Sequence, residues 1–354
     1  MSAAPAAAAA TAVASAELGL DLLREWLAST LSHGVIDARP SVEFVAERID
    51  GTVNFPADEI ATRFHELPPP HGSVKLGLIG GDVGLVARLT KRGYVIRFAL
   101  AWDAALRVAS SESPQGVLTN VALTPAALRR LWTPSPCLAG LVDSVESITK
   151  VRVALDLGCG VGRDCVFLAQ RGWSVVAIDH LSRFTSKCVD LAGRHLVSDR
   201  VSPLEIDLTA PGCAESSALA PLVASAGLIH LARFMHRDLI ADLLRVAPLG
   251  CCIIVHQFCE GAQRIGPCRP KRAQFLLQPG ELQLDAHALG WEVICDEERP
   301  IDDGRPLSWF LAVRRHVLER PAPKIERAAP KSAAQWCPVD AAARVNSLAP
   351  KHSR

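Results

Sequence analysis

The chain has 354 residues, 49% hydrophobic and 21% charged, which is typical of a globular protein long enough for two domains. The formal net charge of +1 gives no global attraction to nucleic acid or to a membrane, and no apolar run approaches the length of a membrane span. The 11 cysteines show no paired metal-ligand spacing, and we expect no secretory leader before them. We therefore expect reduced thiols, no metal and a cytoplasmic location.

The two ends of the chain differ in composition from its middle. Residues 1–18 are rich in alanine and the first arginine is Arg24, so we expect a disordered N-terminus, with organellar targeting as the alternative. Residues 321–354 combine proline and alanine with scattered basic residues, which predicts a flexible basic tail. Three segments are predicted between the ends: a first domain over 19–110, a linker over 111–130 and a second domain over 131–320.

The first domain alternates helical and strand patterns. The sequence predicts helices over 20–27 and 83–92 and strands over 35–37 and 75–79. Residues 37–44 (DARPSVEF) and 48–56 (RIDGTVNFP) follow these patterns. They resemble the motifs D-x-R-x-x-x-E-[FY] and H-I-x-G-A-x-[NH]-x-P of the rhodanese-like domain. The resemblance implies a small α/β domain.

This first domain departs from the rhodanese pattern at the active site. An active rhodanese carries a cysteine after the strand that corresponds to 75–79, whereas this chain has Gly80-Gly81-Asp82 there and its first cysteine is Cys137. A thiolate is the nucleophile of sulfur transfer, so we expect no sulfurtransferase activity. The domain is interpreted as a regulator, or as a recognition module for a protein partner.

The second domain opens on the most informative stretch of the chain. An apolar run over 151–155 leads into Asp156-Leu157-Gly158-Cys159-Gly160-Val161-Gly162, and a second run over 173–178 ends at Asp179. A strand, a glycine-rich turn and a helix bring bare backbone amides against a ligand. An acid after the next strand can bind the two hydroxyls of a ribose. The pattern predicts a nucleoside pocket at the carboxyl edge of a parallel sheet.

The spacing of the glycines separates two nucleoside cofactors. A dinucleotide motif G-x-G-x-x-G would need its third glycine at position 163, which is Arg163. The motif D-x-G-C-G-x-G instead resembles class I S-adenosylmethionine (SAM)-dependent methyltransferases. This implies SAM as cofactor and a Rossmann-like seven-stranded sheet, mostly parallel with an antiparallel edge hairpin, preceded by the smaller rhodanese-like α/β domain. The cofactor-binding residues would be Asp156, Gly158, Cys159, Gly160, Gly162, Asp179, His180 and Asp207; a turn or cap role is the alternative for Asp207.

Three further segments resemble fusions of a rhodanese-like domain with tellurite-resistance and thiopurine methyltransferases. They are L-W-x-P-x-P at 131–136, R-[FY]-[LM]-H-R at 233–237 and L-x-P-G-E-L at 277–282. For the first of them, a proline-broken interdomain loop is an equal alternative. Polar groups at strand ends gather at one sheet edge, so the catalytic candidates are Arg233, His236 and Arg237.

The acceptor side of the site is less defined by the sequence. The connection 261–278 is long enough to be a lid over the acceptor pocket, and its Arg264, Arg269, Lys271 and Arg272 could attract an anion or nucleic acid, although a solvated loop is the plainer interpretation. His236 and His256 are the candidates for a general base. Strands over 291–295 and 307–313 would form the edge hairpin.

We expect a SAM-dependent methyltransferase acting on a small molecule. The alternatives are a SAM-binding regulatory protein without catalysis and an NAD(P)-dependent oxidoreductase.

Overall fold

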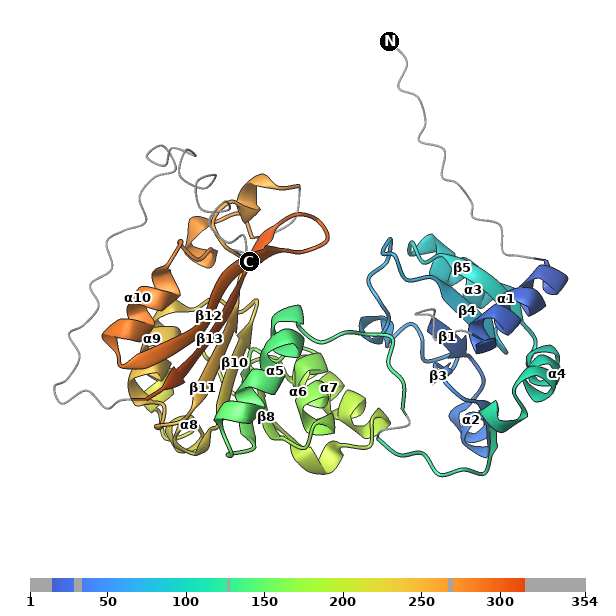
Figure 1. Cartoon of the computed structure of the whole chain (residues 1–354), viewed down its shortest axis with the longest axis horizontal. Helices are drawn as coiled ribbons and strands as arrows, with labels where there is room; N and C mark the ends of the chain where they lie inside the picture. Colours follow the sequence, from blue (N-terminus) through green and yellow to red (C-terminus); the bar gives the residue numbers. More distant parts are fainter. Residues whose placement is uncertain (1–14, 29–33, 126–127, 267–269, 316–354) are drawn as a thin grey trace, which may run out of the picture.

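The computed structural model describes residues 15–28, 34–125, 128–266 and 270–315, which form two α/β units (Figure 1). The expected α/β class with a mostly parallel sheet is confirmed. No helix in the described part of the chain is long and apolar enough to cross a membrane.

The N-terminal unit is built on a parallel sheet of four strands in the order β3-β1-β4-β5. The strands are β1 (Gly34–Asp37), β3 (Val53–Asn54), β4 (Leu76–Ile79) and β5 (Ile96–Leu100). Both faces are covered, as parallel sheets require. Helices α1 (Ala16–Ala28) and α4 (Trp102–Glu112) pack on one face and α3 (Val83–Lys91) on the other.

A second, two-stranded sheet extends this unit beyond its predicted boundary. β2 (Glu47–Ile49), which follows α2 (Ser41–Ala46), pairs antiparallel with β6 (Val117–Thr119). β6 lies inside the segment predicted as a linker, and its pairing attaches this segment to the N-terminal unit. Two short 3-10 helices, Phe64–Glu66 and Pro114–Gly116, complete the unit.

The C-terminal unit contains a seven-stranded sheet in the order β12-β13-β11-β10-β7-β8-β9. The parallel strands are β7 (Val153–Leu157), β8 (Ser174–Asp179), β9 (Val201–Glu205), β10 (Leu228–Ala232) and β11 (Cys252–His256). β12 (Trp291–Pro300) and β13 (Pro306–Arg314) form an antiparallel edge hairpin. The chain runs outward from β7 through β8 and β9 and then returns to β10 on the other side of β7. Ligands of open α/β sheets bind at such a reversal of strand order, outside the carboxyl ends.

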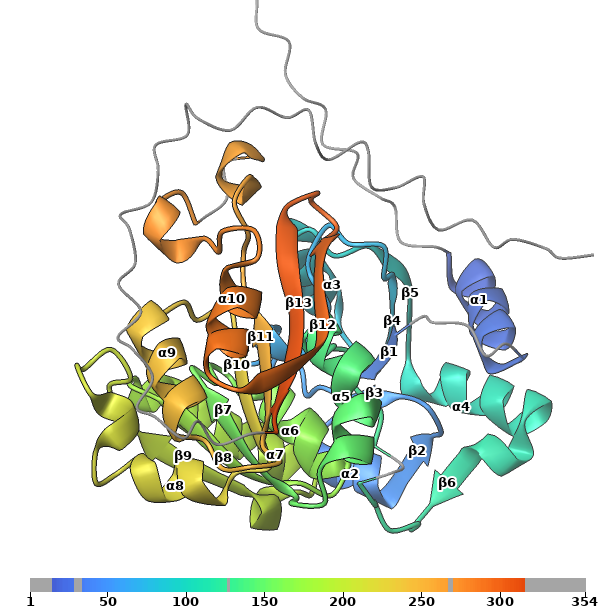
Figure 2. The ribbon, with the colours of Figure 1, turned by 60° about the vertical axis from the view of Figure 1, so that its left-hand side comes forward.

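Helices cover both faces of the large sheet (Figure 2). One face packs on α5 (Pro136–Ile148), α6 (Arg163–Gln170) and α7 (Ser182–Arg194). The other packs on α8 (Ala220–Ser225), α9 (Arg237–Val246) and α10 (Glu281–Ala288). The remaining 3-10 helices are Ser198–Arg200, Cys213–Glu215, Ala262–Arg264 and Ala273–Phe275.

The segment that joins the units makes contacts with both of them. Trp132 is buried in the C-terminal core and its Nε1 donates to Nε2 of His195 at 3.3 Å. The guanidinium of Arg130 lies 5.0 Å from the ring centre of Phe167. Leu131, between them, packs against the N-terminal core. Successive side chains therefore contact opposite units.

Candidate functional site

The glycine-rich loop between β7 and α6 has a left-handed backbone at all three of its glycines. The φ angles are 77° at Gly158, 54° at Gly160 and 81° at Gly162, a region that side chains with a Cβ avoid. A Cβ on Gly158 would lie 2.8 Å from Phe234, and one on Gly162 would overlap Cys188. A Cβ on Gly160 would meet nothing within 4 Å. Two of the glycines are thus needed for close packing, and the loop is open at Gly160.

The backbone amides of this loop are bonded within the protein. Those of Gly158 and Cys159 both donate to the carbonyl of Ile178 at 2.9 Å, and that of Gly162 donates to the carbonyl of Cys159 at 3.0 Å. The amide of Gly160 donates to Oδ2 of Asp179 at 3.1 Å. Each of these four amides thus has an acceptor within the protein in this conformation, and their donation to a ligand stays a prediction.

Asp179 is fixed at the carboxyl end of β8. Its Oδ1 accepts the amide of Leu181 at 3.0 Å, and Nδ1 of His180 lies 3.4 Å from the same oxygen. Asp179 is 7% exposed. Because a carboxylate oxygen has two lone pairs, each oxygen can accept a further hydrogen bond. The two bonds hold the acid beside the glycine loop and leave room for the predicted ribose contact.

Asp207 is exposed, two residues after β9. It accepts hydrogen bonds from the amide of Thr209 at 2.9 Å and from its hydroxyl at 2.6 Å. These bonds, with a smaller contribution from the positive fields of His180 and His236, lower the pKa of Asp207. The turn role that the sequence allowed for Asp207 is present, and its contact with an adenine stays a prediction.

The three catalytic candidates after β10 have different surroundings. Arg233 has φ 58°, its amide donates to the carbonyl of His256 at 2.8 Å, and its exposed side chain has no ion-pair partner among the described residues. His236 caps α9, because its Nδ1 accepts the amide of Leu239 at 3.2 Å. Arg237 pairs with Glu281 at 2.6 Å and donates to the carbonyls before α10. Arg233 is therefore the cation best placed to meet an anionic group, and a catalytic role for any of the three stays a prediction.

A buried polar network beneath the loop contains residues that sequence reasoning missed. Nδ1 of His230 lies 2.9 Å from Oδ1 of Asp156, whose Oδ2 accepts the thiol of Cys165 at 2.9 Å. On the other side of the ring, Nε2 of His230 lies 3.9 Å from Asp164. Burial alone would lower the pKa of His230, but the hydrogen bond and charge of Asp156 outweigh it and raise the pKa. Asp156, expected in the cofactor site, thus supports the loop from below through its side chain.

The network continues to the carboxyl end of β11. The amide of Ser135 donates to Asp164 at 2.6 Å, and its hydroxyl lies 2.7 Å from Nδ1 of His256. Burial, then the charges of Arg233 and His230, lower the pKa of His256 to about 3. A histidine with this pKa is neutral at pH 7 and a weak base.

One signal in the sequence could have indicated the network. His230 is a polar residue inside a strand, β10, whose other residues are apolar.

The connection predicted as a lid is anchored at its C-terminal end. Leu276 is fully buried with Phe258 and Leu307, and the carbonyl of Leu276 accepts a bond from Arg237. Arg264 is largely exposed and lies 3.9 Å from Glu260, and Nζ of Lys271 donates to two backbone carbonyls. Residues 267–269, including the predicted anion-binding Arg269, lie outside the described residues. Closure of this segment over a substrate stays a prediction.

In the part of the chain that the structure describes, no group of three or more His, Cys, Asp or Glu side chains could hold a metal ion.

Comparisons with known proteins bear on this same region. The family model of the tellurite resistance protein TehB matches residues 133–198. These residues include the glycine loop, Asp179 and the helices that pack against them, while the N-terminal unit lies outside the match. No curated protein sequence matches the chain.

Several solved structures are similar to this chain. TehB from Haemophilus influenzae is 16% identical over 59% of this chain and 66% of its own, with a TM-score of 0.38. A TehB-like SAM-dependent methyltransferase from Corynebacterium glutamicum is 17% identical over 51% of this chain and 88% of its own, with a TM-score of 0.34. Magnesium protoporphyrin IX methyltransferase from Synechocystis is 16% identical over 50% of this chain and 77% of its own, with a TM-score of 0.38, and was solved with SAM and with SAH bound.

Proposed function

We propose that the C-terminal unit is a SAM-dependent methyltransferase acting on a small molecule and that the N-terminal unit is a non-catalytic rhodanese-like module. The observation that carries the proposal is the loop with left-handed Gly158, Gly160 and Gly162, held against Asp179 where the strand order reverses. The TehB match over residues 133–198 supports it.

The residues around the loop fit SAM. The open face at Gly160 gives space for a nucleoside, and Asp179 retains lone pairs for two ribose hydroxyls. Arg233 lies at the same edge of the sheet and can pair with the carboxylate of the methionine part. Arg163 stands where a dinucleotide motif needs its third glycine, so an NAD(P)-dependent oxidoreductase is the weaker alternative.

The methyl group of SAM is transferred by in-line displacement to an atom that already carries a lone pair. The chain must therefore orient the two reactants and exclude water. With a pKa of about 3, His256 is a poor acceptor for a substrate proton, and Nδ1 of His236 is engaged in capping α9. These two features favour a soft acceptor that needs little help from a general base, such as sulfur, selenium or tellurium in a small molecule; a thiol would react as its thiolate, with its proton released to solvent.

Transfer of tritium from methyl-labelled SAM tests the proposal. The full chain would be incubated with a metabolite extract and, separately, with tellurite, selenite and small thiols, and label would be followed into the products. We expect transfer by the wild type and, at a SAM concentration that does not saturate the variant, about a hundredfold less by Asp179→Ala. Melting shifts with SAH and with NAD separate the alternatives: an SAH shift without transfer to any acceptor would indicate a binding protein, and a shift with NAD alone would indicate an oxidoreductase.

A further inference from the structure

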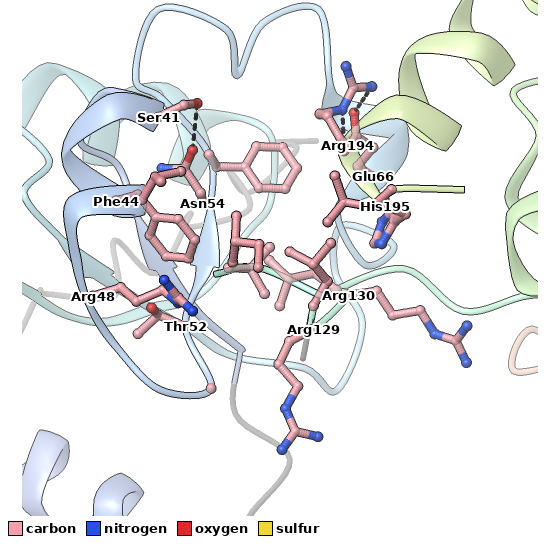
Figure 3. A pocket seen from close by; sticks show the side chains of 18 of the residues that line it. Ser41, Phe44, Arg48, Thr52, Asn54, Glu66, Arg129, Arg130, Arg194 and His195 are labelled. Atoms are coloured by element: carbon pink, nitrogen blue, oxygen red, sulfur yellow. Dashed lines mark hydrogen bonds and ion pairs between the residues drawn. The ribbon is translucent and has the colours of Figure 1, made fainter. Parts of the chain in front are cut away.

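A cavity of about 340 Å³ lies where the two units meet, away from the glycine loop (Figure 3). The N-terminal unit contributes α2, β2, β3 and the chain that follows them. The C-terminal unit contributes Gly193–Leu196 at the end of α7, and the connecting segment contributes Leu128–Trp132. The volume is within the range of small-molecule sites, roughly 300–1,000 Å³.

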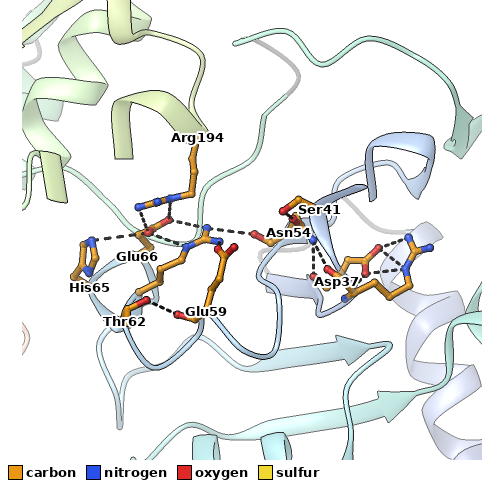
Figure 4. A network of polar contacts seen from close by, with 10 residues as sticks. Asp37, Ser41, Asn54, Glu59, Thr62, His65, Glu66 and Arg194 are labelled. Atoms are coloured by element: carbon orange, nitrogen blue, oxygen red, sulfur yellow. Dashed lines mark hydrogen bonds and ion pairs between the residues drawn. The ribbon is translucent and has the colours of Figure 1, made fainter. Parts of the chain in front are cut away.

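The charged groups on one wall of the cavity neutralise one another. Glu66 is 2% exposed and binds Arg63 of its own unit at 2.9 Å and Arg194 of the other unit at 2.5 Å (Figure 4). Glu59 pairs with Arg63 at 2.8 Å. This wall therefore joins the two units and leaves little charge for a ligand.

Arg48 lies on the wall formed by the N-terminal unit and, unlike Arg63 and Arg194, has no carboxylate partner among the described residues. It is 4% exposed, its Nη1 donates to the carbonyl of Val121 at 3.0 Å, and its Nη2 has no hydrogen-bond partner. No carboxylate of the described residues forms an ion pair with it. In Figure 3 its guanidinium points toward the middle of the cavity, whereas those of Arg129 and Arg130 point away. A buried cation without a counter-charge is unfavourable, and an anion in the cavity would supply one.

Apolar side chains provide much of the remaining lining, and polar ones such as Thr52 and Asn54 provide the rest. Phe44 lies beside Arg48, with 5.7 Å from its ring centre to the guanidinium carbon. Ile49 and Phe55 continue this surface, and Leu128 and Leu131 line the cavity from the connecting segment. A buried cation without an ion-pair partner, beside a largely apolar surface, is the arrangement expected for a ligand with a single anionic group.

We propose that this junction cavity binds a small organic anion, with a carboxylate, sulfonate or phosphate group near Arg48 and an apolar body against Phe44 and Leu131. The site is separate from the proposed methyl-transfer site and does not depend on that function. A ligand there contacts both units at once.

A matched pair of fluorescent probes tests the proposal on the full chain. 8-Anilinonaphthalene-1-sulfonate is an apolar anion, and N-phenyl-1-naphthylamine lacks only its sulfonate. The anionic probe is expected to bind one saturable site, and Arg48→Met is expected to weaken it by about tenfold or more, the loss of one charge-assisted contact. Binding of the neutral probe should be the same in both proteins. Arg107→Met, which removes an exposed arginine of α4, is the matched control and should change neither.

Three results would overturn the proposal: no saturable binding of the sulfonate, equal affinity in the wild type and Arg48→Met, or displacement of the sulfonate by SAH. A second variant, Leu128→Trp, keeps Arg48 and fills the cavity from the connecting segment, so it tests the site even if Arg48→Met does not fold. It should abolish binding of both probes while the melting temperature stays close to that of the wild type. Undiminished binding in a folded Leu128→Trp protein would also overturn the proposal.

Discussion

The two units present the carboxyl ends of their parallel strands in opposite ways. In the C-terminal unit, Asp179 keeps free lone pairs and Arg233 has no ion-pair partner among the described residues. In the N-terminal unit, Asp37 at the end of β1 binds Arg39 at 2.6 Å, and the guanidinium of Arg39 stacks 3.3 Å from the ring centre of Trp102. Asp82, after β4, is used to cap α3. The comparison shows that two sheets of the same kind can differ in function, because a ligand can bind at the strand ends only where polar groups are not already paired within the protein.

The largest effect is expected for Asp179→Ala. The change removes two hydrogen bonds to a charged acceptor, worth roughly 1.5–3 kcal/mol each, so SAH affinity should fall by about a hundredfold or more. Titration calorimetry with SAH measures this loss. Asp199→Ala, an exposed aspartate of the same unit, is the matched control. Unchanged affinity in Asp179→Ala would contradict the contrast between the two sheet edges.

This prediction rests on features that the sequence could supply, because the glycine loop and Asp179 each lie in one contiguous motif. Local spacing fixes such a strand, turn and helix. The network beneath the loop could not be predicted in the same way, since His230 is 74 residues from Asp156 and Ser135 is 121 residues from His256.

The pairing of short strands and the partners of long side chains could not be predicted from the sequence either. β6 has three residues and pairs with β2 about 70 positions away, so no local pattern indicated it. Arg237 follows the strand as expected, but Glu281 on α10 holds its side chain. Tertiary contacts between distant segments decide such positions, and the sequence alone does not specify them.

A pH series tests His256, the buried histidine at the carboxyl end of β11. The parallel strands of the N-terminal unit end in Asp37, Asn54, Ile79 and Leu100, so none of them ends in a histidine. The pKa of His256 is about 3 in the folded protein, and that of an exposed histidine is about 6.5. Between these pH values His256 is protonated in the unfolded chain and neutral in the folded protein. Its contribution to stability is present above pH 6.5 and is lost as pH falls toward 3.

The expected loss between pH 7 and pH 5 is about 2 kcal/mol, at about 1.4 kcal/mol per pH unit below 6.5. Urea unfolding at the two pH values measures it. His256→Asn should reduce the difference between them. His195, whose burial lowers its pKa to about 4, contributes in the same direction and His230, with its raised pKa, in the opposite one. An equal pH dependence in His256→Asn would show that this histidine is not held neutral.

Two glycines of the loop should respond unequally to alanine. Gly162→Ala combines a left-handed backbone with an overlap with Cys188 and is expected to cost about 3 kcal/mol of stability. Gly160→Ala meets only the backbone strain, about 1 kcal/mol. Chemical denaturation of the two variants measures the difference. A larger cost at Gly160 would mean that the open face is occupied by protein.

Asp82→Ala should have a smaller effect, confined to the N-terminal unit. Oδ1 of Asp82 accepts the amide of Leu85 at 2.6 Å, and loss of such a cap costs about 1 kcal/mol. SAH affinity should not change. Thermal unfolding and calorimetry of one preparation measure both quantities, and a loss of SAH binding would show that the two sheet edges are not independent.

No measurable effect is expected in a sulfurtransferase assay. The full chain should form thiocyanate from thiosulfate and cyanide no faster than buffer does, because no cysteine precedes Cys137 and the loop after β4 is Gly80-Gly81-Asp82. Activity above that rate would require a persulfide on a later cysteine, and serine variants of those cysteines would locate it.

The alternating contacts of residues 130–132 limit how the two units can turn against each other. Rotation about this segment in either direction would pull Trp132 from one core or Leu131 from the other, and the carboxylate of Glu66 would have to release Arg194. For protein engineering, lengthening the segment with a flexible spacer would uncouple the two units, and a fragment cut after residue 132 would expose the pocket for an indole ring on the surface of the C-terminal unit.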